Sequence, residues 1–291
     1  TKRREPWLFG ESVTAQVRVA LRLRYALLPY LYTLFAEHAA EAPPPMRPLW
    51  WHFPSDGALL GNAWWGGAAA AEPFLLGDAI LVQPIATPGC ARASVYLPAE
   101  PPTADALWYH LHTLAPTRST PARRIATVAV GADAVPAFLR GGAILARRDR
   151  PRRSSAQTHA DAFTLVVAPD VGGAAAGRLY LDGYDGYEHA AGANLTVAFE
   201  YVGGAQVSTL SVRPGPSKRP VAAAASAVER VLVLGIAAPP AAVRVCRGGA
   251  SNAGGACAAA AFSHDAATSV LTVRKPGATI GEAWELELPH I

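Results

Sequence analysis

Short runs of β-branched and aromatic residues recur along most of this 291-residue chain, separated by glycine and proline. Such runs are typical of the strands of an all-β sandwich, because these side chains fit a half-buried pleated surface. We therefore expect β-sheet over most of the chain beyond about residue 74. The runs fall at 93–97, 107–111, 125–130, 143–146, 163–167, 178–181, 195–201, 206–212, 230–234, 242–245, 269–273 and 283–288.

The first part of the chain has a different pattern. Apolar residues at helical spacing predict a helix over 12–42, with Ser12 as its N-cap. Pro29 lies inside this pattern and should bend or break the helix, since proline lacks a backbone N–H and clashes with the preceding turn. Prolines at 43–45 end the helix, and the apolar run 46–53 predicts a buried strand. A helix followed by a buried strand is typical of a parallel α/β fold.

The composition indicates an ordered globular protein. Hydrophobic residues make up 51% of the chain and charged residues 16%, a balance unlike that of disordered segments. Much of the hydrophobic content is alanine, and we interpret the runs 68–71, 222–225 and 258–261 as loop filler. The sequence has no run of about 20 apolar residues, so no membrane span is predicted.

The net charge of +4 is concentrated in one short stretch. Residues 140–153 contain six arginines and a single acid, Asp149, with no aromatic residue between them. Binding of single-stranded nucleic acid needs stacking aromatic side chains as well as positive charge. We therefore predict a solvated connector rather than a nucleic-acid surface, and place a domain boundary near residue 150.

The cysteines do not predict a metal site. Cys90, Cys246 and Cys257 are too few for a disulfide framework and lack the spacing of metal ligands. Cys246 and Cys257 could close a short loop in an oxidising compartment or remain free thiols. Asn194 begins the triplet Asn-Leu-Thr, a candidate N-glycosylation acceptor that fits a secretory-pathway protein.

Taken residue by residue, the sequence predicts no catalytic centre and no cofactor site. Glycosidases commonly need two carboxylates on either side of the scissile bond. The closest arrangement here is Asp182 and Asp185, whose Asp-Gly spacing predicts turns instead. His110 and His112 alternate on an expected strand without a third ligand nearby, so we interpret them as a surface pair.

Several motifs nevertheless follow one another in an order shared with a known family. They are REPW (4–7), RYALLPYLYTLF (24–35), MRPLW (46–50), FLLGDAILV (74–82), VYLP (95–98), WY (108–109) and FLRGGAI (138–144). This order resembles that of glycoside hydrolase family 31, over nearly the whole chain. Segments 152–155, 229–231 and 269–277 further resemble the endoplasmic-reticulum branch of that family.

The resemblance implies a multi-domain fold, in which the C-terminal end of a (β/α)₈ barrel is followed by two all-β sandwich domains. Residues 1–73 would be the last helix and strand of the barrel, with the strand at 46–53. Residues 74–150 would form a proximal β domain and residues 151–291 a distal one. The two catalytic aspartates of the family lie on earlier barrel strands, so the resemblance assigns no catalytic residue to this chain.

The resemblance also implies an activity, that of a retaining α-glucosidase acting on terminal α-linked glucose. The expected role is N-glycan trimming in the endoplasmic reticulum lumen, with a carbohydrate substrate, no cofactor, and a regulatory β subunit as candidate partner. Two alternatives stay open: another family member of the acid α-glucosidase or α-xylosidase type, and a non-catalytic carbohydrate-binding β module. Because the catalytic aspartates are expected upstream, the chain alone is predicted to be inactive.

Overall fold

The computed structural model describes residues 3–60, 72–87, 89–130, 135–247 and 257–290. Its helices are α1 (Glu11–Ala26), α2 (Leu28–Glu41) and the single turn α3 (Leu49–His52), with 3-10 turns η1 (Pro6–Phe9), η2 (Gly57–Leu59), η3 (Ala156–Thr158), η4 (Glu188–Ala191) and η5 (Ala222–Ala225). The strands of the first half are β1 (Met46–Pro48), β2 (Phe74–Leu76), β3 (Ile80–Val82), β4 (Arg92–Tyr96), β5 (Ala106–His110), β6 (Pro116–Ser119), β7 (Ile125–Ala129), β8 (Ala137–Arg140) and β9 (Ala143–Arg147). Those of the second half are β10 (Phe163–Ala168), β11 (Ala174–Leu181), β12 (Leu195–Val202), β13 (Val207–Pro214), β14 (Val228–Leu234), β15 (Arg244–Arg247), β16 (Cys257–Ala259), β17 (Phe262–Asp265), β18 (Val270–Arg274) and β19 (Trp284–Pro289).

The predicted N-terminal helix is broken, as expected, next to Pro29. Leu27 separates α1 from α2, and Pro29 falls in the first turn of α2, where its missing N–H costs nothing. The prediction of Ser12 as N-cap was wrong. The N-cap is Gly10, two residues earlier, whose φ of +91° turns the chain out of η1, so Ser12 is already helical.

The expected strand over 46–53 was wrong beyond Pro48. Only β1 is extended, and it pairs antiparallel with β2. Pro48 has no N–H to continue a ladder and instead precedes α3. Leu49 and Phe53 are buried, but Trp50 and Trp51 are 45% and 52% exposed, so the predicted buried strand was wrong in its backbone conformation and in part of its burial.

A smaller β unit follows the helices. Its strands form a six-stranded sheet in the order β1-β2-β3-β8-β5-β6 and a two-stranded sheet of β4 and β7. Large side chains pack between them, among them the fully buried Phe53, Trp108 and Phe138. The indole N–H of Trp108 donates to the Pro98 carbonyl at 3.1 Å, so the polar atom of this core side chain is satisfied.

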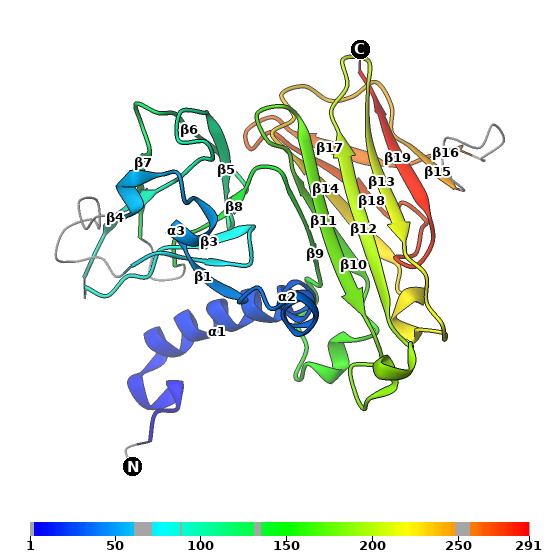
Figure 1. The fold of residues 1–291 in the computed structure, drawn as a ribbon, viewed down its shortest axis with the longest axis horizontal. Coiled ribbons are helices and arrows are strands. Elements are labelled where there is room, and N and C mark those ends of the chain that lie inside the picture. Colours follow the sequence, from blue (N-terminus) through cyan, green and yellow to red (C-terminus); the bar gives the residue numbers. More distant parts are fainter. Residues whose placement is uncertain (1–2, 61–71, 88, 131–134, 248–256, 291) are drawn as a thin grey trace.

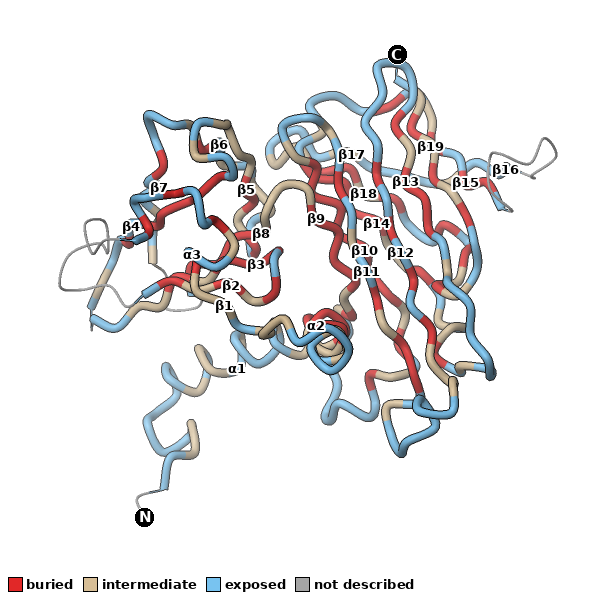
Figure 2. Tube along the Cα trace, viewed as in Figure 1, coloured by how far each residue is buried: buried red, intermediate tan, exposed pale blue. Residues whose placement is uncertain are grey.

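The larger β unit is one eleven-stranded sheet in the order β16-β15-β19-β13-β12-β11-β9-β10-β14-β18-β17. Its two ends, β16 and β17, are consecutive in the chain, so the sheet curls back on itself around a buried interior (Figures 1 and 2). Strand β12 alternates buried and exposed residues along its whole length, the pattern of a sheet with one face in the core. Strand β19 lies inside the sheet, paired with β13 on one side and β15 on the other.

Helix α2 lies between the two β units (Figure 1). A separate buried cluster joins Leu27, Tyr30 and Leu34 to Leu139 of the smaller unit and to Leu145 of the larger sheet. The further members Val166, Leu232 and Val270 also come from the larger sheet, so this sheet is covered on both faces in that region. The two β units and α2 therefore share one continuous core.

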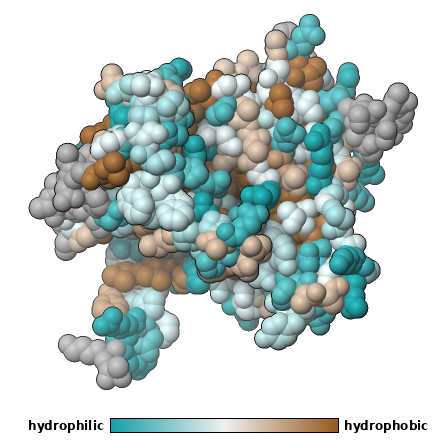
Figure 3. Space-filling model, viewed as in Figure 1, coloured by the Kyte–Doolittle hydropathy of each residue, from teal (hydrophilic) through white to brown (hydrophobic). Residues whose placement is uncertain are grey.

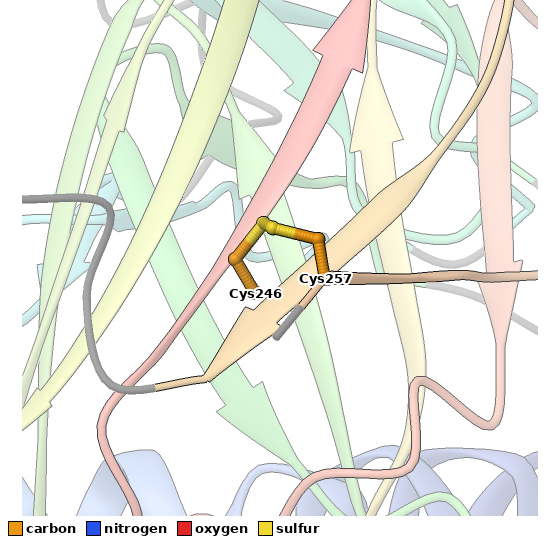
Figure 4. The surroundings of a disulfide bond; sticks show 2 residues. All are labelled: Cys246 and Cys257. Carbon is orange, nitrogen blue, oxygen red and sulfur yellow. A yellow bond between two sulfur atoms is a disulfide. The ribbon is translucent and has the colours of Figure 1, made fainter. Parts of the chain in front are cut away.

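Two alanine runs predicted to be loop filler have structural roles, and the third, 68–71, lies outside the described residues. Residues 222–225 form η5, with Ala223 buried against the core of the larger unit. Residues 258–259 belong to β16. Cys257 in that strand is directly opposite Cys246 and forms a disulfide with it, which settles the alternative left open by the sequence (Figure 4).

Candidate functional site: the junction of helix α2 with the β units

The polar side chains of α2 reach out to both β units. Tyr30 donates its hydroxyl hydrogen to the Leu76 carbonyl at 2.8 Å and accepts from the Ala79 amide at 3.4 Å. Burial raises the pKa of Tyr30 far above its usual value, so this phenol stays protonated and remains a donor. Tyr30 thus fixes α2 to the turn between β2 and β3.

Gly77 lies in that turn with φ +62°, a left-handed conformation that favours glycine. A Cβ atom at this position would be only 2.2 Å from the Tyr30 hydroxyl oxygen and 2.6 Å from Cδ2 of Leu34. The turn can approach α2 closely only because residue 77 has no side chain.

On its other side, α2 is bonded to the larger sheet through Tyr32. The Tyr32 hydroxyl lies 2.8 and 3.0 Å from the two carboxylate oxygens of Asp182, which is only 4% exposed. The Tyr184 amide also donates to Asp182, at 2.7 Å. Burial first, and then the Asp182 carboxylate, raise the pKa of Tyr32. Asp182 therefore forms the predicted turn and also anchors the helix, a second role that the sequence did not reveal.

Thr33 and Glu37 add two more links from α2 to strand β11. The Thr33 hydroxyl donates to the Pro29 carbonyl and accepts from the Tyr180 amide, each at 2.9 Å. Glu37 Oε1 lies 3.2 Å from Nε of Arg178. Burial raises the pKa of Glu37 despite the opposing effect of Arg178, so this ion pair is the less favourable of the two links.

A cavity of about 320 Å³ opens beside these links, between α2, the connection from β8 to β9 and β11. Its charged lining residues are Glu37, Asp78, Arg140, Asp170 and Arg178. Arg140 stacks over the Phe53 ring, 5.0 Å from its centroid, and contacts His52. Burial lowers the pKa of Arg140 and also, with Arg140 as the second cause, that of His52.

Two of the three carboxylates that line this cavity have structural partners. Glu37 is paired with Arg178, and Asp170 accepts from the Gly172 and Ala174 amides at 2.8 and 2.9 Å. Carboxylates held this way stabilise a turn and a helix contact rather than act as an acid and a nucleophile. The cavity therefore belongs to the junction and does not by itself define a catalytic pair.

The arginine-rich segment after β9 is held by internal partners. Arg148 is 3% exposed, and its guanidinium donates to the Asp161 and His159 carbonyls while its amide donates to Ala26 at the end of α1. Arg152 donates to the Asp161 carboxylate at 2.9 Å, and this hydrogen bond lowers the pKa of Asp161. The positive charges of Arg148 and Arg152 are thus used in bonds to residues 159–161, while the main chain of Arg148 joins this segment to α1.

The remaining residues singled out in the sequence lie apart from the junction. His110 and His112 have ring centroids 5.8 Å apart, and His110 Nδ1 accepts from the Thr113 amide. Within the described ranges, no group of three or more histidine, cysteine, aspartate or glutamate residues could hold a metal ion. Asn194 precedes β12, and its amide donates to the His189 carbonyl at 2.8 Å. None of the described helices combines the length and apolar character that a membrane crossing needs.

Two protein-family descriptions match this chain. The glycosyl hydrolases family 31 TIM-barrel domain matches residues 1–34, and the glycosyl hydrolase family 31 C-terminal domain matches residues 42–145. Together they cover α1, the first half of α2 and the smaller β unit. The chain belongs to glycoside hydrolase family 31.

Within that family the chain is close to the α subunit of glucosidase II. It is similar to a crystal structure of that subunit, with a TM-score of 0.81 and 27% identity over 99% of this chain and 30% of the other. It is 38% identical to a probable glucan 1,3-alpha-glucosidase of Oryza sativa subsp. japonica over 81% of this chain. It is 33% identical to neutral alpha-glucosidase AB of Sus scrofa over 99% of this chain. The chain spans 24% and 28% of the lengths of these two relatives.

Proposed function

We propose that the protein containing this chain is a retaining α-glucosidase that removes terminal α-linked glucose, with N-glycans as its substrate. The observation that carries the proposal is the likeness to the glucosidase II α subunit over 99% of this chain. Two relatives of this chain are named as α-glucosidases, which supports the same proposal. Hydrolysis would use two aspartates outside this chain, through a covalent glycosyl-enzyme intermediate.

In this proposal the chain closes the catalytic barrel and attaches it to the supporting β units. The exposed hydrophobic side chains on and before α1 are consistent with this role, since Trp7, Phe9 and Leu21 are 64%, 58% and 44% exposed. Figure 3 shows hydrophobic surface over α1. The rest of the barrel would cover this face, as patches of this kind mark interaction surfaces.

The three-part division into 1–73, 74–150 and 151–291, as barrel end, proximal domain and distal domain, stays a prediction. Strand pairs cross both limits, because β1 pairs with β2 and β9 with β10. Strand β9, which precedes residue 150, is therefore part of the larger sheet.

The endoplasmic reticulum lumen is the proposed location. The disulfide between Cys246 and Cys257 fits an oxidising compartment, and the proposed N-glycosylation of Asn194 fits the same location. A regulatory subunit is the proposed partner, because the chain is 26% identical to a structure described as a heterodimer of a glucosidase II catalytic subunit with the binding domain of its regulatory subunit.

A chimera tests the proposed function. Residues 1–291 would replace the matching segment of the glucosidase II α subunit, and hydrolysis of 4-nitrophenyl α-glucoside would be measured. We expect activity within about tenfold of the parent enzyme. A soluble, folded chimera without activity would overturn the proposal. Residues 1–291 alone should give no turnover, and measurable hydrolysis by that chain would contradict the placement of the catalytic aspartates outside it.

The alternatives make different predictions in the same assay. An α-xylosidase type would be indicated if the intact protein that contains this chain, with its own barrel strands, hydrolysed 4-nitrophenyl α-xyloside better than the glucoside. A purely carbohydrate-binding module predicts an inactive chimera, together with glycan binding by residues 74–291 in calorimetry.

A further inference from the structure

A groove runs across one end of the larger β unit, between the loop 182–193 and the segment 220–226. It consists of two neighbouring cavities of about 340 and 520 Å³. Both cavities are lined by Gly183 and Ala222, so they form one continuous depression. All the residues that line it are described by the structure.

The lining of the groove combines small apolar residues with carboxylates. Ala222 and Ala223 form part of its wall, while Asp182 lines one cavity and Asp185 and Glu188 line the other. Asp182 is buried and held in place by Tyr32 and by the Tyr184 amide, so its position is fixed before any ligand arrives. A fixed carboxylate is a strong acceptor for hydroxyl hydrogens.

Aromatic rings border the groove. The His159 ring stacks on Tyr184, with centroids 4.1 Å apart and planes 24° apart, and both residues line the cavity. Burial and the neighbouring Arg148 lower the pKa of His159, so the ring is neutral at pH 7. Tyr187 is 85% exposed. It does not itself line either cavity, but it lies in sequence between Gly186 and Glu188, which both line the groove.

These features match a pyranose sugar better than a cation or an anion. A sugar ring has an apolar C–H face for an aromatic or alanine surface and a rim of hydroxyl groups for carboxylates. The guanidinium of Arg148 donates to the Tyr184 hydroxyl at 3.4 Å, and no group of residues that could hold a metal ion occurs among the described residues. The carboxylates would repel an anion.

We propose that this groove binds a short neutral gluco-oligosaccharide, with Tyr187 as a stacking platform and Glu188 as a hydroxyl acceptor. The choice of α-linked glucose as the probe rests on the proposed function, whereas the groove itself does not.

The test is titration of residues 1–291 with maltotriose, followed by amide NMR. We expect saturable shifts of the Gly183, Gly186 and Gly192 amides with a dissociation constant of about 1 mM. Tyr187→Ala should weaken binding about fivefold, the effect of losing one aromatic contact. Glu188→Gln should weaken it about tenfold by removing a charged acceptor.

Two further variants control for indirect effects. Val202→Ala changes a side chain of the same β unit that is 54% exposed, and should leave the affinity unchanged. Ala222→Trp fills the wall shared by both cavities and should abolish the shifts.

The proposal is overturned if the amide resonances show no saturable shifts when the maltotriose concentration reaches about 20 times the expected dissociation constant. Shifts that persist unchanged in both Tyr187→Ala and Ala222→Trp would overturn it too. Because the readout is binding by a chain that is expected not to hydrolyse anything, an inactive chimera would leave this result untouched.

Discussion

Helices α1 and α2 come from one continuous helical pattern but have opposite environments. None of the α1 side chains is buried, whereas α2 buries Pro29, Tyr30, Thr33 and Leu34. The polar groups of α2 are also used, in bonds to Leu76, Tyr180 and Asp182. Helix α2 is therefore an integral part of the β units, while α1 has no buried side chain that packs against them. Paired substitutions, one at or beside each helix, test whether the two helices differ in this way.

The largest difference is expected for leucine truncation. Leu34 is 3% exposed in the shared core, and Leu34→Ala should lower the free energy of unfolding by about 3 to 4 kcal/mol through the cavity that it leaves. Leu21 is 44% exposed on α1, and Leu21→Ala should cost less than about 0.5 kcal/mol. Urea denaturation followed by circular dichroism measures both. Equal losses would show that α1 is packed as firmly as α2.

Glycine substitution should give the next largest difference. Gly77→Ala places a Cβ against Tyr30 and Leu34 in a left-handed turn, and should cost about 2 to 3 kcal/mol. Gly10, which precedes α1, has φ +91°, but a Cβ atom at this position would have no neighbouring atom within 4 Å. For Gly10→Ala we therefore expect only a backbone strain of about 1 kcal/mol. Thermal unfolding of the two variants separates crowding from strain. The explanation fails if Gly10→Ala proves the more damaging.

Removal of one hydroxyl tests the bond to Asp182. Tyr32→Phe should cost about 1 kcal/mol by leaving a buried carboxylate with one donor fewer, whereas Tyr25→Phe on α1 should be nearly neutral. Because the pKa of folded Tyr32 is raised, the stability gained from its protonated form is complete below about pH 10, the unfolded value. That stability is lost as the pH rises further. Stability curves between pH 8 and 11 should therefore fall less steeply in Tyr32→Phe than in the parent.

The smallest effect is expected for the ion pair of Glu37. The Arg178 side chain is 58% exposed, so Arg178→Met should change the free energy of unfolding by less than about 0.5 kcal/mol. Arg22→Met on α1 should have a similarly small effect. The free energy of unfolding would be measured for both variants at low and high salt. A loss in Arg178→Met that exceeds about 0.5 kcal/mol and persists at high salt would show that the pair is more strongly shielded from water than its exposure suggests.

The sequence was most informative where one local rule determined the structure. Pro29 predicted the helix break, and the run of β-branched and aromatic residues at 195–201 predicted a strand, which the structure forms as β12 with one face in the core. It failed at 46–53, where an apolar run is compatible with either a strand or a turn of helix and only Pro48 distinguishes them.

The junction was harder to predict because its bonds join distant residues. Tyr32 and Asp182 are 150 positions apart, and Thr33 and Tyr180 are joined over a comparable separation. A signal did exist, since tyrosine and threonine hydroxyls lie on the otherwise apolar second half of the predicted helix. A buried polar group needs a partner, but the sequence alone does not say which one.

The position of β19 has a consequence for synthesis of the protein. This strand is an internal strand of the larger sheet, yet it is translated after both of its neighbours, β13 and β15. The unpaired edge of β13 must wait for residues 284–289, which at about 5 to 20 residues per second takes on the order of 10 s. During that interval the nascent chain presents an open strand edge to other chains. Chaperone engagement on the ribosome should therefore be strongest while residues 215–283 are being made.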